Sequence, residues 1–271
     1  MTWQTVRIPG SPELTCDVAG DGPDVVLVHG IGGNRTNWSA QLDSLSKTTR
    51  TIAIDLRGYG DSEDPSGPLD FFDFVSDLAR AMDHLGAGSA HMVGLSMGGL
   101  VVQAFYARFP HRVSSLTLAA CRPGDRPVFD DPRRFAAERI APSTGDQAAV
   151  MVDEMLPRLL GPAPSDNARA TIRASLEALH PAAYRKTMAA RLSIEPFLDM
   201  ATIDVPTLVV AASHDTVAPC AQMRVIAAQI PHARFEVIED AGHLLNIEKP
   251  SEFNAILASF LQSEAALSRS A

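Results

Sequence analysis

Cysteine is scarce in this chain, and long hydrophobic runs are absent from it. The three cysteines, Cys16, Cys121 and Cys220, are odd in number and lack the spacing of a metal site, so the sequence predicts neither a disulfide framework nor a bound metal. No apolar run approaches the roughly 18 residues of a membrane span. Residues 1–5 (MTWQT) also lack the apolar centre of a signal peptide. We therefore expect a cytoplasmic protein.

Positive charge is the second shortage. Lys and Arg together number 23 against 32 Asp and Glu, which gives a net charge of −9 at pH 7. A protein of this charge repels phosphate groups, so we expect neither nucleic acid nor an anionic membrane as a partner. Hydrophobic residues, by contrast, make up 46% of the 271 residues. A chain of this length and composition can bury a large core as one domain with an insertion.

Apolar strand patterns alternate with helical patterns along most of the chain, which favours an α/β fold with a parallel sheet. The eight expected strands lie near residues 3–9, 13–19, 24–29, 50–55, 89–94, 113–120, 206–212 and 233–239. The expected helices between and after them lie near residues 37–47, 70–86, 96–109, 219–230 and 250–262. The first two strands flank residues 9–12 (PGSP), a turn sequence that predicts an antiparallel hairpin at the edge of the sheet.

The alternation stops between residues 122 and 203, where only helical patterns occur. Proline and glycine interrupt these patterns at residues 161–164 (GPAP) and 180–181 (HP). We interpret residues 122–203 as a helical cap that is inserted after the sixth strand. Residues 1–121 and 204–271 then form the core, a mostly parallel eight-stranded sheet flanked by helices.

The most informative motif is residues 93–99 (VGLSMGG), which join the end of an apolar strand to the start of a helix. This is the context of a G-x-S-x-G nucleophile elbow, in which a sharp turn exposes one serine hydroxyl. Side chains at Gly94 and Gly98 would clash with neighbouring backbone in such a turn. The motif therefore predicts that Ser96 is a nucleophile, beside the positive end of the following helix.

A serine hydroxyl is a good nucleophile only when a base takes its proton, so a histidine and an acid are expected after the elbow. Asp215 follows the seventh strand, and His243 follows the eighth. Because the carboxyl ends of parallel strands meet at one edge of a sheet, we predict His243 as general base and Asp215 as the acid that orients it. His214 points away from its neighbour Asp215 on an extended segment. Asp240 lies too near His243 in the sequence to orient its ring.

Residues 25–34 (VVLVHGIGGN) form a strand followed by a glycine-rich loop. Attack on a carbonyl places negative charge on its oxygen, and two preset backbone N–H groups stabilise that charge. We predict Ile31 as one donor and Met97, the residue after the nucleophile, as the other. The loop also partly matches a dinucleotide-binding motif with Asp55 ending the next strand, but Arg35 replaces the third glycine.

These motifs resemble those of the α/β-hydrolase superfamily over nearly the whole chain. The matching segments are residues 29–30 (HG), residues 55–62 (DLRGYGDS), the elbow, Asp215 and residues 241–243 (AGH). The elbow and residues 246–250 (NIEKP) are similar to 3-oxoadipate enol-lactonases and related small carboxylic-ester hydrolases. The resemblance implies a serine hydrolase that uses no cofactor and no metal and cleaves a small ester or lactone through an acyl-enzyme.

Other activities share these motifs. C–C bond hydrolysis of a vinylogous diketo acid uses the same three residues, and cofactor-free perhydrolases or haloperoxidases have the same fold. A receptor that keeps the three residues to sense a ligand is the non-catalytic alternative. Haloalkane dehalogenases and epoxide hydrolases of this fold use an aspartate nucleophile, so Ser96 argues against both. For an enzyme we expect a small-molecule substrate and a monomer or homodimer.

Candidate substrate contacts are fewer. Arg122 directly follows the sixth strand at the same sheet edge, where its guanidinium is placed to bind a substrate carboxylate bidentately or to pair with Asp125. Trp38, Phe135 and Met155 are candidates for an apolar pocket wall, and packing of the cap or core is the alternative for each. Further basic candidates in the cap are Arg133, Arg134, His180 and Arg191.

Overall fold

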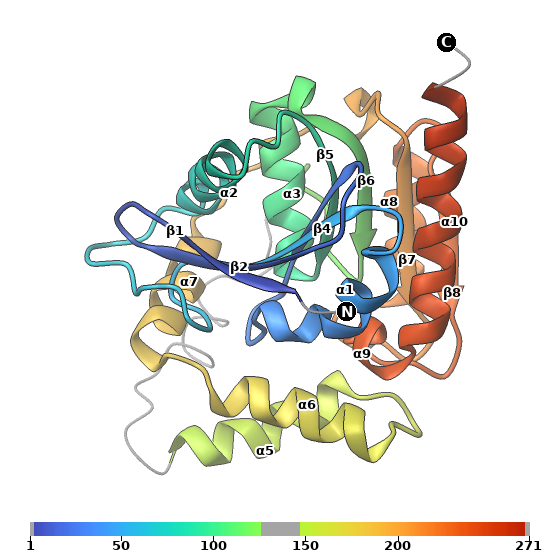
Figure 1. Ribbon diagram of the computed structural model, residues 1–271. Helices are drawn as coiled ribbons and strands as arrows, with labels where there is room; N and C mark the ends of the chain where they lie inside the picture. Colours follow the sequence, from blue (N-terminus) through green and yellow to red (C-terminus); the bar gives the residue numbers. More distant parts are fainter. Residues whose placement is uncertain (1–2, 126–146, 269–271) are drawn as a thin grey trace.

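An eight-stranded sheet forms the centre of the molecule in the computed structural model, which describes residues 3–125 and 147–268 (Figure 1). Its strands are β1 (Gln4–Ile8), β2 (Leu14–Ala19), β3 (Asp24–Val28), β4 (Arg50–Asp55), β5 (Ala90–Leu95), β6 (Val113–Ala119), β7 (Thr207–Ala212) and β8 (Arg234–Ile238). They lie side by side in the order β1-β2-β4-β3-β5-β6-β7-β8. The prediction of eight strands is confirmed.

Two kinds of pairing divide the sheet. β1 pairs with β2, and β2 with β4, in antiparallel register, with Ile8 opposite Leu14 beside the turn. From β4 to β8 every neighbouring pair is parallel. The predicted hairpin at the edge of a mostly parallel sheet is therefore confirmed. Because the parallel strands run in one direction, the loops that follow them meet at one edge of the sheet.

Helices flank the sheet and cover its apolar strands (Figure 1). They are α1 (Ser39–Leu45), α2 (Phe72–His84), α3 (Met97–Arg108), α8 (Cys220–Gln229), α9 (Leu245–Glu248) and α10 (Pro250–Ser268). Short 3-10 helices are η1 (Arg35–Trp38), η2 (Pro110–Arg112) and η3 (Met200–Thr202). α1 packs with α10, α2 packs with α3, and α8 lies against β7. The last helix extends beyond its predicted end at residue 262, to Ser268.

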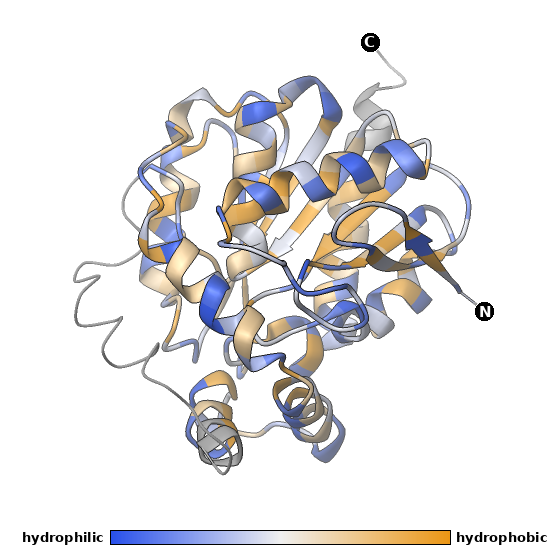
Figure 2. Ribbon diagram, turned by 90° about the vertical axis from the view of Figure 1, so that its left-hand side faces the viewer, coloured by the Kyte–Doolittle hydropathy of each residue, from blue (hydrophilic) through white to orange (hydrophobic). Residues whose placement is uncertain are grey.

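The core lies where these layers meet (Figure 2). β7 (TLVVAA) is buried at all of its positions, as expected for a parallel strand with both faces covered. α3 is likewise buried from Met97 to Tyr106, and its sequence is apolar around most of its circumference. β1, at the edge, is mostly exposed. The strand and helix on either side of the elbow thus belong to the most deeply buried part of the molecule.

Helices of the inserted region follow β6. Those among the described residues are α5 (Gln147–Leu159), α6 (Asp166–Glu177) and α7 (Pro181–Leu192), and β7 comes after them in the chain. Figure 1 shows α5 and α6 side by side, apart from the layers that flank the sheet. Their contact buries Val152, Leu156, Ile172 and Leu176 in a small cluster separate from the main core. The insertion of helices after the sixth strand is present as predicted, whereas the domain boundaries at residues 122 and 203 stay a prediction.

Membrane spans and metal-binding clusters are both absent from the described ranges. No helix there is long and apolar enough to cross a membrane. Within the same ranges, no three His, Cys, Asp or Glu side chains gather closely enough to hold a metal ion. Cys16, Cys121 and Cys220 are all free thiols.

Candidate active site

Ser96 stands at the apex of the turn between β5 and α3. Its backbone has φ 55° and ψ −116°, a conformation that residues other than glycine rarely adopt. A Cβ on Gly98 would lie 2.1 Å from the carbonyl oxygen of Val28, and one on Gly94 would lie 2.3 Å from that of Gly98. Only glycine fits at these two positions, as the motif predicts. Close backbone packing therefore holds the strained turn that presents the Ser96 hydroxyl.

Three side chains from three strand ends form a continuous hydrogen-bond chain. His243 Nε2 lies 2.8 Å from Ser96 Oγ, and His243 Nδ1 lies 2.8 Å from Asp215 Oδ2. Because a carboxylate only accepts hydrogen bonds, Nδ1 carries the ring proton, and Nε2 is left to accept from the serine hydroxyl. His243 is 4% and Asp215 6% exposed, so water does not compete for these contacts.

Backbone N–H groups fix the Asp215 carboxylate. Its Oδ1 accepts from the N–H groups of Val217 and Ala218, at 2.7 and 2.9 Å, and its Oδ2 is left for His243. Among the described residues, no Lys or Arg pairs with this carboxylate. The loop after β7 therefore sets both the position of the carboxylate and the ring tautomer of His243.

The neighbours that could be mistaken for members of this chain face elsewhere. His214 is exposed, and its Nε2 lies 3.6 Å from Asp240 Oδ1 rather than near Ser96. Asp240 does not join the chain either: its backbone N–H donates to Ser213 Oγ at 3.0 Å. Both residues therefore lie outside the hydrogen-bond chain, as predicted.

The loop after β3 lies directly against the elbow. A Cβ on Gly30 would come within 2.9 Å of Ser96 Cβ, which places the next residue, Ile31, beside the serine. Ile31 lines the same cavity as Ser96. Met97 is the first residue of α3, so its N–H has no partner within the helix. The structure thus brings both predicted oxyanion donors to the serine, and their role stays a prediction.

His29 ties this loop to β4. The buried His29 ring places Nδ1 2.8 Å from the carbonyl oxygen of Gly30 and Nε2 3.1 Å from the backbone nitrogen of Leu56. Burial lowers the pKa of His29. The ring is therefore neutral: Nδ1–H donates to Gly30, and Nε2 accepts from the Leu56 N–H. Both ring nitrogens are used to hold the start of the loop.

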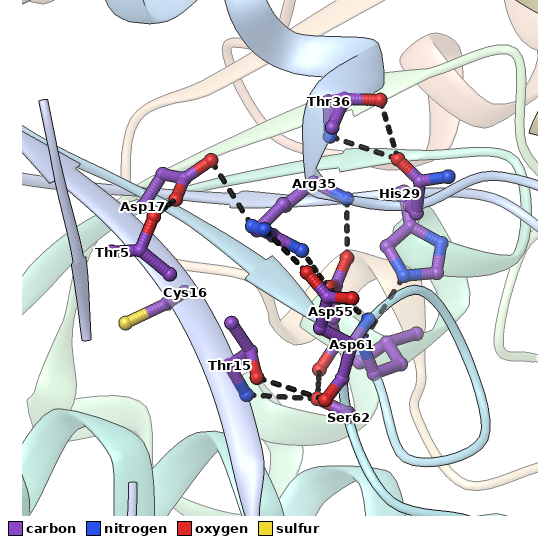
Figure 3. Close-up of polar contacts among 12 residues, drawn as sticks. Thr5, Thr15, Cys16, Asp17, His29, Arg35, Thr36, Asp55, Asp61 and Ser62 are labelled. Atoms are coloured by element: carbon purple, nitrogen blue, oxygen red, sulfur yellow. Dashed lines mark hydrogen bonds and ion pairs between the residues drawn. The ribbon is translucent and has the colours of Figure 1, made fainter. Parts of the chain in front are cut away.

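A charged network centred on Arg35 lies behind the loop (Figure 3). The Arg35 guanidinium forms ion pairs with Asp17 at 3.1 Å, with the fully buried Asp55 at 2.5 Å and with Asp61 at 2.7 Å. Burial alone would lower the pKa of Arg35, but the Asp55 charge and hydrogen bonds to Asp61 and Asp55 outweigh it and raise the pKa. The Arg35 guanidinium therefore binds Asp55, the acid that the dinucleotide-binding alternative needs for its ligand.

A cavity of about 220 Å³ opens beside Ser96 and His243. Its apolar wall includes Met155, Leu159 and Met188. Three arginines line it as well, and none of its lining residues in the described ranges is acidic. These arginines are Arg122, Arg158 and Arg191. A small chamber of about 30 Å³, lined by Arg122, Arg191, Ser96 and His243 among others, adjoins the same hydroxyl.

Two of the predicted substrate contacts lie at the cavity. Arg122 and Met155 both line the cavity. Among the described residues Arg122 has no ion pair, and the expected alternative partner Asp125 accepts instead from Gln229 Nε2 at 2.8 Å. Phe135, like Arg133 and Arg134, lies outside the described residues.

The prediction for Trp38 is corrected by the structure. Its indole is 1% exposed and packs against Phe253 of α10, with ring centroids 6.1 Å apart. It does not line the cavity beside Ser96 but borders a separate space of about 20 Å³ behind the loop after β3. The η1 helix that follows the loop turns the indole into the core, so Trp38 supports the loop from behind.

Sequence patterns do not reveal every residue of the cavity. Arg158, Tyr184 and Val217 line the cavity, but nothing in their local sequence distinguishes them. Arg191, a further candidate, also lines it; burial, with a contribution from the like charge of Arg122, lowers the pKa of Arg191 to about 10. His180, by contrast, contacts Asp64 through Nδ1 at 2.7 Å on the surface.

A mostly parallel sheet with a serine elbow after β5 and an acid and a histidine after β7 and β8 defines the class of α/β hydrolases. The chain belongs to the alpha/beta hydrolase fold family, whose model matches residues 23–250. The protein is accordingly an enzyme, a hydrolase.

Named relatives agree with this assignment. The chain is 28% identical over 260 residues to a pyrrolizixenacetamide deacetylase from Xenorhabdus hominickii, covering 94% of this chain and 97% of that protein. It resembles the solved thermophilic esterase from Thermogutta terrifontis, with a TM-score of 0.85, 30% identity and coverage of 96% and 99%. It also resembles the enol-lactonase from Burkholderia xenovorans, with a TM-score of 0.84, 28% identity and coverage of 96% and 100%.

Proposed function

We propose that this hydrolase is a cofactor-independent serine enzyme that cleaves a small carboxylic ester or lactone through an acyl-enzyme. The observation that carries the proposal is the hydrogen-bond chain from Ser96 Oγ through the His243 ring to Asp215. That chain activates the hydroxyl and stabilises the charged imidazole that forms when it takes the proton. Similarity to an esterase and an enol-lactonase supports the proposed substrate class.

The first half of the reaction forms the acyl-enzyme. Ser96 Oγ attacks the carbonyl carbon while His243 Nε2 takes the hydroxyl proton, and negative charge develops on the carbonyl oxygen. The N–H groups of Ile31 and Met97 donate to that oxygen. The C–O bond to the leaving alkoxide then breaks as His243 returns the proton to it. The acyl group remains on Ser96, and for a lactone the alcohol stays attached to it.

The second half reverses these roles with water. His243 Nε2 takes a proton from a water molecule, whose oxygen attacks the acyl carbon. The tetrahedral intermediate collapses, Ser96 Oγ leaves and regains its proton from His243, and the carboxylic acid is released. The one base therefore serves both half-reactions, and its neutral form starts each of them.

The cavity walls support an acidic substrate. Arg122, Arg158 and Arg191 line the space next to the hydroxyl, with no acidic lining residue in the described ranges to balance them. A guanidinium binds a carboxylate through two parallel hydrogen bonds. Arg122 and Arg191 also line the small chamber that adjoins Ser96. Of the two we take Arg122 as the anchor, because it follows β6 at the edge of the sheet that carries the site. The proposed substrate thus has a carboxylate close to the bond that is cleaved.

Replacement and labelling of the serine test the mechanism. Ser96→Ala should lower kcat by about 10³-fold or more, as loss of a triad nucleophile does. Ser76→Ala, an exposed serine on α2, is the matched control and should retain full activity. The wild type should gain one adduct on Ser96 with an organophosphate or a sulfonyl fluoride, and Ser96→Ala none. An adduct elsewhere, or residual activity near wild type, would exclude the acyl-enzyme.

A substrate panel separates the alternatives. p-Nitrophenyl esters of rising chain length, simple lactones and enol-lactones should be hydrolysed, with chelator present and without loss of rate. Product analysis with a vinylogous diketo acid tests C–C cleavage, hydrogen peroxide tests perhydrolysis, and an N-acetyl amide tests the deacetylation named for one relative. Slow turnover of every compound, with ligand-dependent capture of a protein, would favour the receptor.

Partners and location belong to the same proposal. We expect the small-molecule substrate to be the partner that matters, with neither nucleic acid nor membrane involved. A monomer or homodimer and a cytoplasmic location stay predictions. Size-exclusion chromatography with light scattering checks the first, and cell fractionation checks the second.

A further inference from the structure

Glu248, at the end of α9, is a buried carboxylate that the reaction described above does not use. The residue is 8% exposed. Its Oε1 accepts from the Gly242 N–H at 2.9 Å, and its Oε2 accepts from the Gly161 N–H at 2.8 Å. No Lys or Arg forms an ion pair with it among the described residues. Two backbone donors from distant parts of the chain therefore hold this carboxylate.

The two donors belong to segments that touch each other. Residues 159–161 connect α5 to the rest of the inserted region, and residues 241–243 form the loop that ends in His243. The His243 N–H donates to the carbonyl oxygen of Leu159 at 2.9 Å. A Cβ on Gly242 would lie 2.4 Å from the backbone nitrogen of Gly161. We name these two segments together the cap–histidine contact.

The carboxylate closes the cap–histidine contact from one side. Each of its oxygens accepts a hydrogen bond from one of the two segments, so Glu248 links them. His243 directly follows Gly242, and its ring contacts both Ser96 and Asp215 at 2.8 Å. A shift of the backbone at Gly242 would carry the ring with it.

The position is costly to maintain, which points to a use for it. Burial raises the pKa of Glu248, and the hydrogen bonds from Gly161 and Gly242 offset burial only in part. A buried carboxylate without a cation destabilises the fold relative to a neutral side chain of the same shape. The two hydrogen bonds offset this cost by holding the cap–histidine contact together.

We propose that Glu248 is a positioning residue that holds His243 in hydrogen-bond distance of Ser96 through the N–H groups of Gly242 and Gly161. Because Gly161 belongs to the inserted region, the alignment of His243 then depends on where the segment after α5 lies. This inference rests on the proposed function, in which His243 is the base. A base displaced by a fraction of an ångström loses rate steeply, because proton transfer needs hydrogen-bond geometry. Substrate binding by the arginine-lined cavity is a separate matter, so kcat rather than KM reports the alignment.

Glu248→Gln is the sharpest single change. The glutamine keeps the shape and one acceptor oxygen, but its NH2 group faces one of the two N–H donors, so one hydrogen bond becomes a donor–donor clash. We expect kcat to fall about 10- to 100-fold with KM unchanged, and the rate of Ser96 labelling by a sulfonyl fluoride to fall in parallel. Glu252→Gln is the matched control, because Glu252 is exposed in the first turn of α10.

Gly161→Ala tests the same contact from the other segment. Its Cβ would meet the backbone nitrogen of Gly242 at 2.8 Å, so it pushes the segments apart while the Glu248 side chain itself is unchanged. If both changes act through one contact, the double variant loses little more than the worse single variant. Additive losses would show two unrelated effects and overturn the proposal. This variant also provides the test if Glu248→Gln fails to fold.

Labelling separates the possible failures. If the folded Glu248→Gln protein is labelled as fast as wild type, with kcat unchanged, Glu248 is structural only, and the proposed function still stands. If wild type itself takes no label at Ser96, the proposed function fails, and this inference fails with it. A parallel fall of kcat and labelling in both single variants, with Glu252→Gln normal, supports the inference.

Discussion

Buried carboxylates on the two sides of Ser96 are held in different ways. On the side of the loop after β3, the Arg35 guanidinium forms ion pairs with Asp17, Asp55 and Asp61 (Figure 3). One positive charge is shared here by three carboxylates, of which Asp17 and Asp55 are buried and Asp61 is exposed. This cluster has no proton to exchange during the proposed reaction, and its place is behind the loop that carries Ile31.

On the histidine side the carboxylates have no such cation among the described residues. Asp215 accepts from the N–H groups of Val217 and Ala218, and Glu248 accepts from those of Gly161 and Gly242. Backbone dipoles position a carboxylate without neutralising it. The difference follows from chemistry: Asp215 must stabilise a positive charge that comes and goes on the imidazole, and a fixed cation beside it would weaken that effect.

We expect the largest effect on kcat from a substitution of Asp215 on the histidine side. Asp215→Asn keeps an oxygen for the N–H groups of Val217 and Ala218 but presents its NH2 to His243. The ring then carries its proton on Nε2 and cannot accept from Ser96, so kcat should fall about 10⁴-fold. Steady-state kinetics with a p-nitrophenyl ester measure this.

Asp240→Asn is the matched control for that change, because Asp240 is an acid on the loop of His243 whose polar contacts among the described residues are with His214 and Ser213. It should leave kcat within a few-fold of wild type. A greater loss from Asp240→Asn than from Asp215→Asn would mean that Asp240, and not Asp215, orients the His243 ring.

The next largest effect is expected on the free energy of unfolding when Arg35 is replaced. Arg35→Met leaves Asp17, Asp55 and Asp61 without their shared cation, and Asp55 is fully buried. Removing one partner of a buried ion pair typically costs about 3–5 kcal/mol in the free energy of unfolding. Urea denaturation measures the loss. Arg7→Met, which removes an exposed pair with Glu13, should cost less than about 1 kcal/mol. Equal losses in both variants would mean that the Arg35 network adds little.

Local patterns in the sequence carried most of the fold and the chemistry. Strands of continuous apolar residues, buried on both faces, were found within a few residues of their true ends. The elbow was identifiable because its glycines are required by contacts within the motif and with the neighbouring strand. The order of Ser96, Asp215 and His243 along the chain then placed each at a strand end, and parallel strands bring such ends together.

Contacts between distant segments were beyond local patterns. Trp38 follows the loop after β3, but packing against Phe253 of α10 turns its indole away from the cavity. The segment that contains Glu248 is distinguished in the sequence by its family resemblance alone, because the partner Gly161 is 87 residues away. Arg158 and Tyr184 reach the cavity only through the placement of α5 and α7. Such placement depends on packing of whole helices, which no single motif encodes.

A smaller effect concerns the cavity between the two sides. Arg122→Met keeps much of the apolar stem but removes the charge and the planar donor fork. If Arg122 binds a substrate carboxylate, kcat/KM should fall about 10- to 100-fold for acidic esters, which corresponds to a charge-assisted hydrogen bond of roughly 1.5–3 kcal/mol. A neutral ester of similar size should lose almost nothing.

Lys249→Met is a control for that change in net charge, since Lys249 lies away from the cavity lining. It should leave the ratio of acidic to neutral substrate unchanged. Equal losses on both substrates in Arg122→Met would indicate a structural role for Arg122. A wild-type preference for neutral acyl chains would remove the acidic substrate from the proposal and leave a general esterase.

The smallest effect is the pH dependence of stability that Glu248 contributes. Its pKa is raised in the folded protein above the ordinary value near 4.5, mainly by burial, with the Asp215 charge acting in the same direction. The folded state therefore binds more protons than the unfolded state within that window. The stability contributed by Glu248 is full below the ordinary pKa and is lost as pH rises through the folded pKa, by about 1.4 kcal/mol for each unit between them.

Glu248→Gln removes this titration, so the difference in unfolding free energy between wild type and Glu248→Gln should fall as pH rises from about 4.5 and then level off. Urea denaturation of both proteins between pH 4 and 8 measures the difference at each pH, and other titrating groups cancel in it. Glu252→Gln, at an exposed position, should give a flat difference over the same range. A difference that rises with pH would mean that the two N–H bonds outweigh burial, so that backbone donors stabilise a buried carboxylate as fully as Arg35 does on the other side.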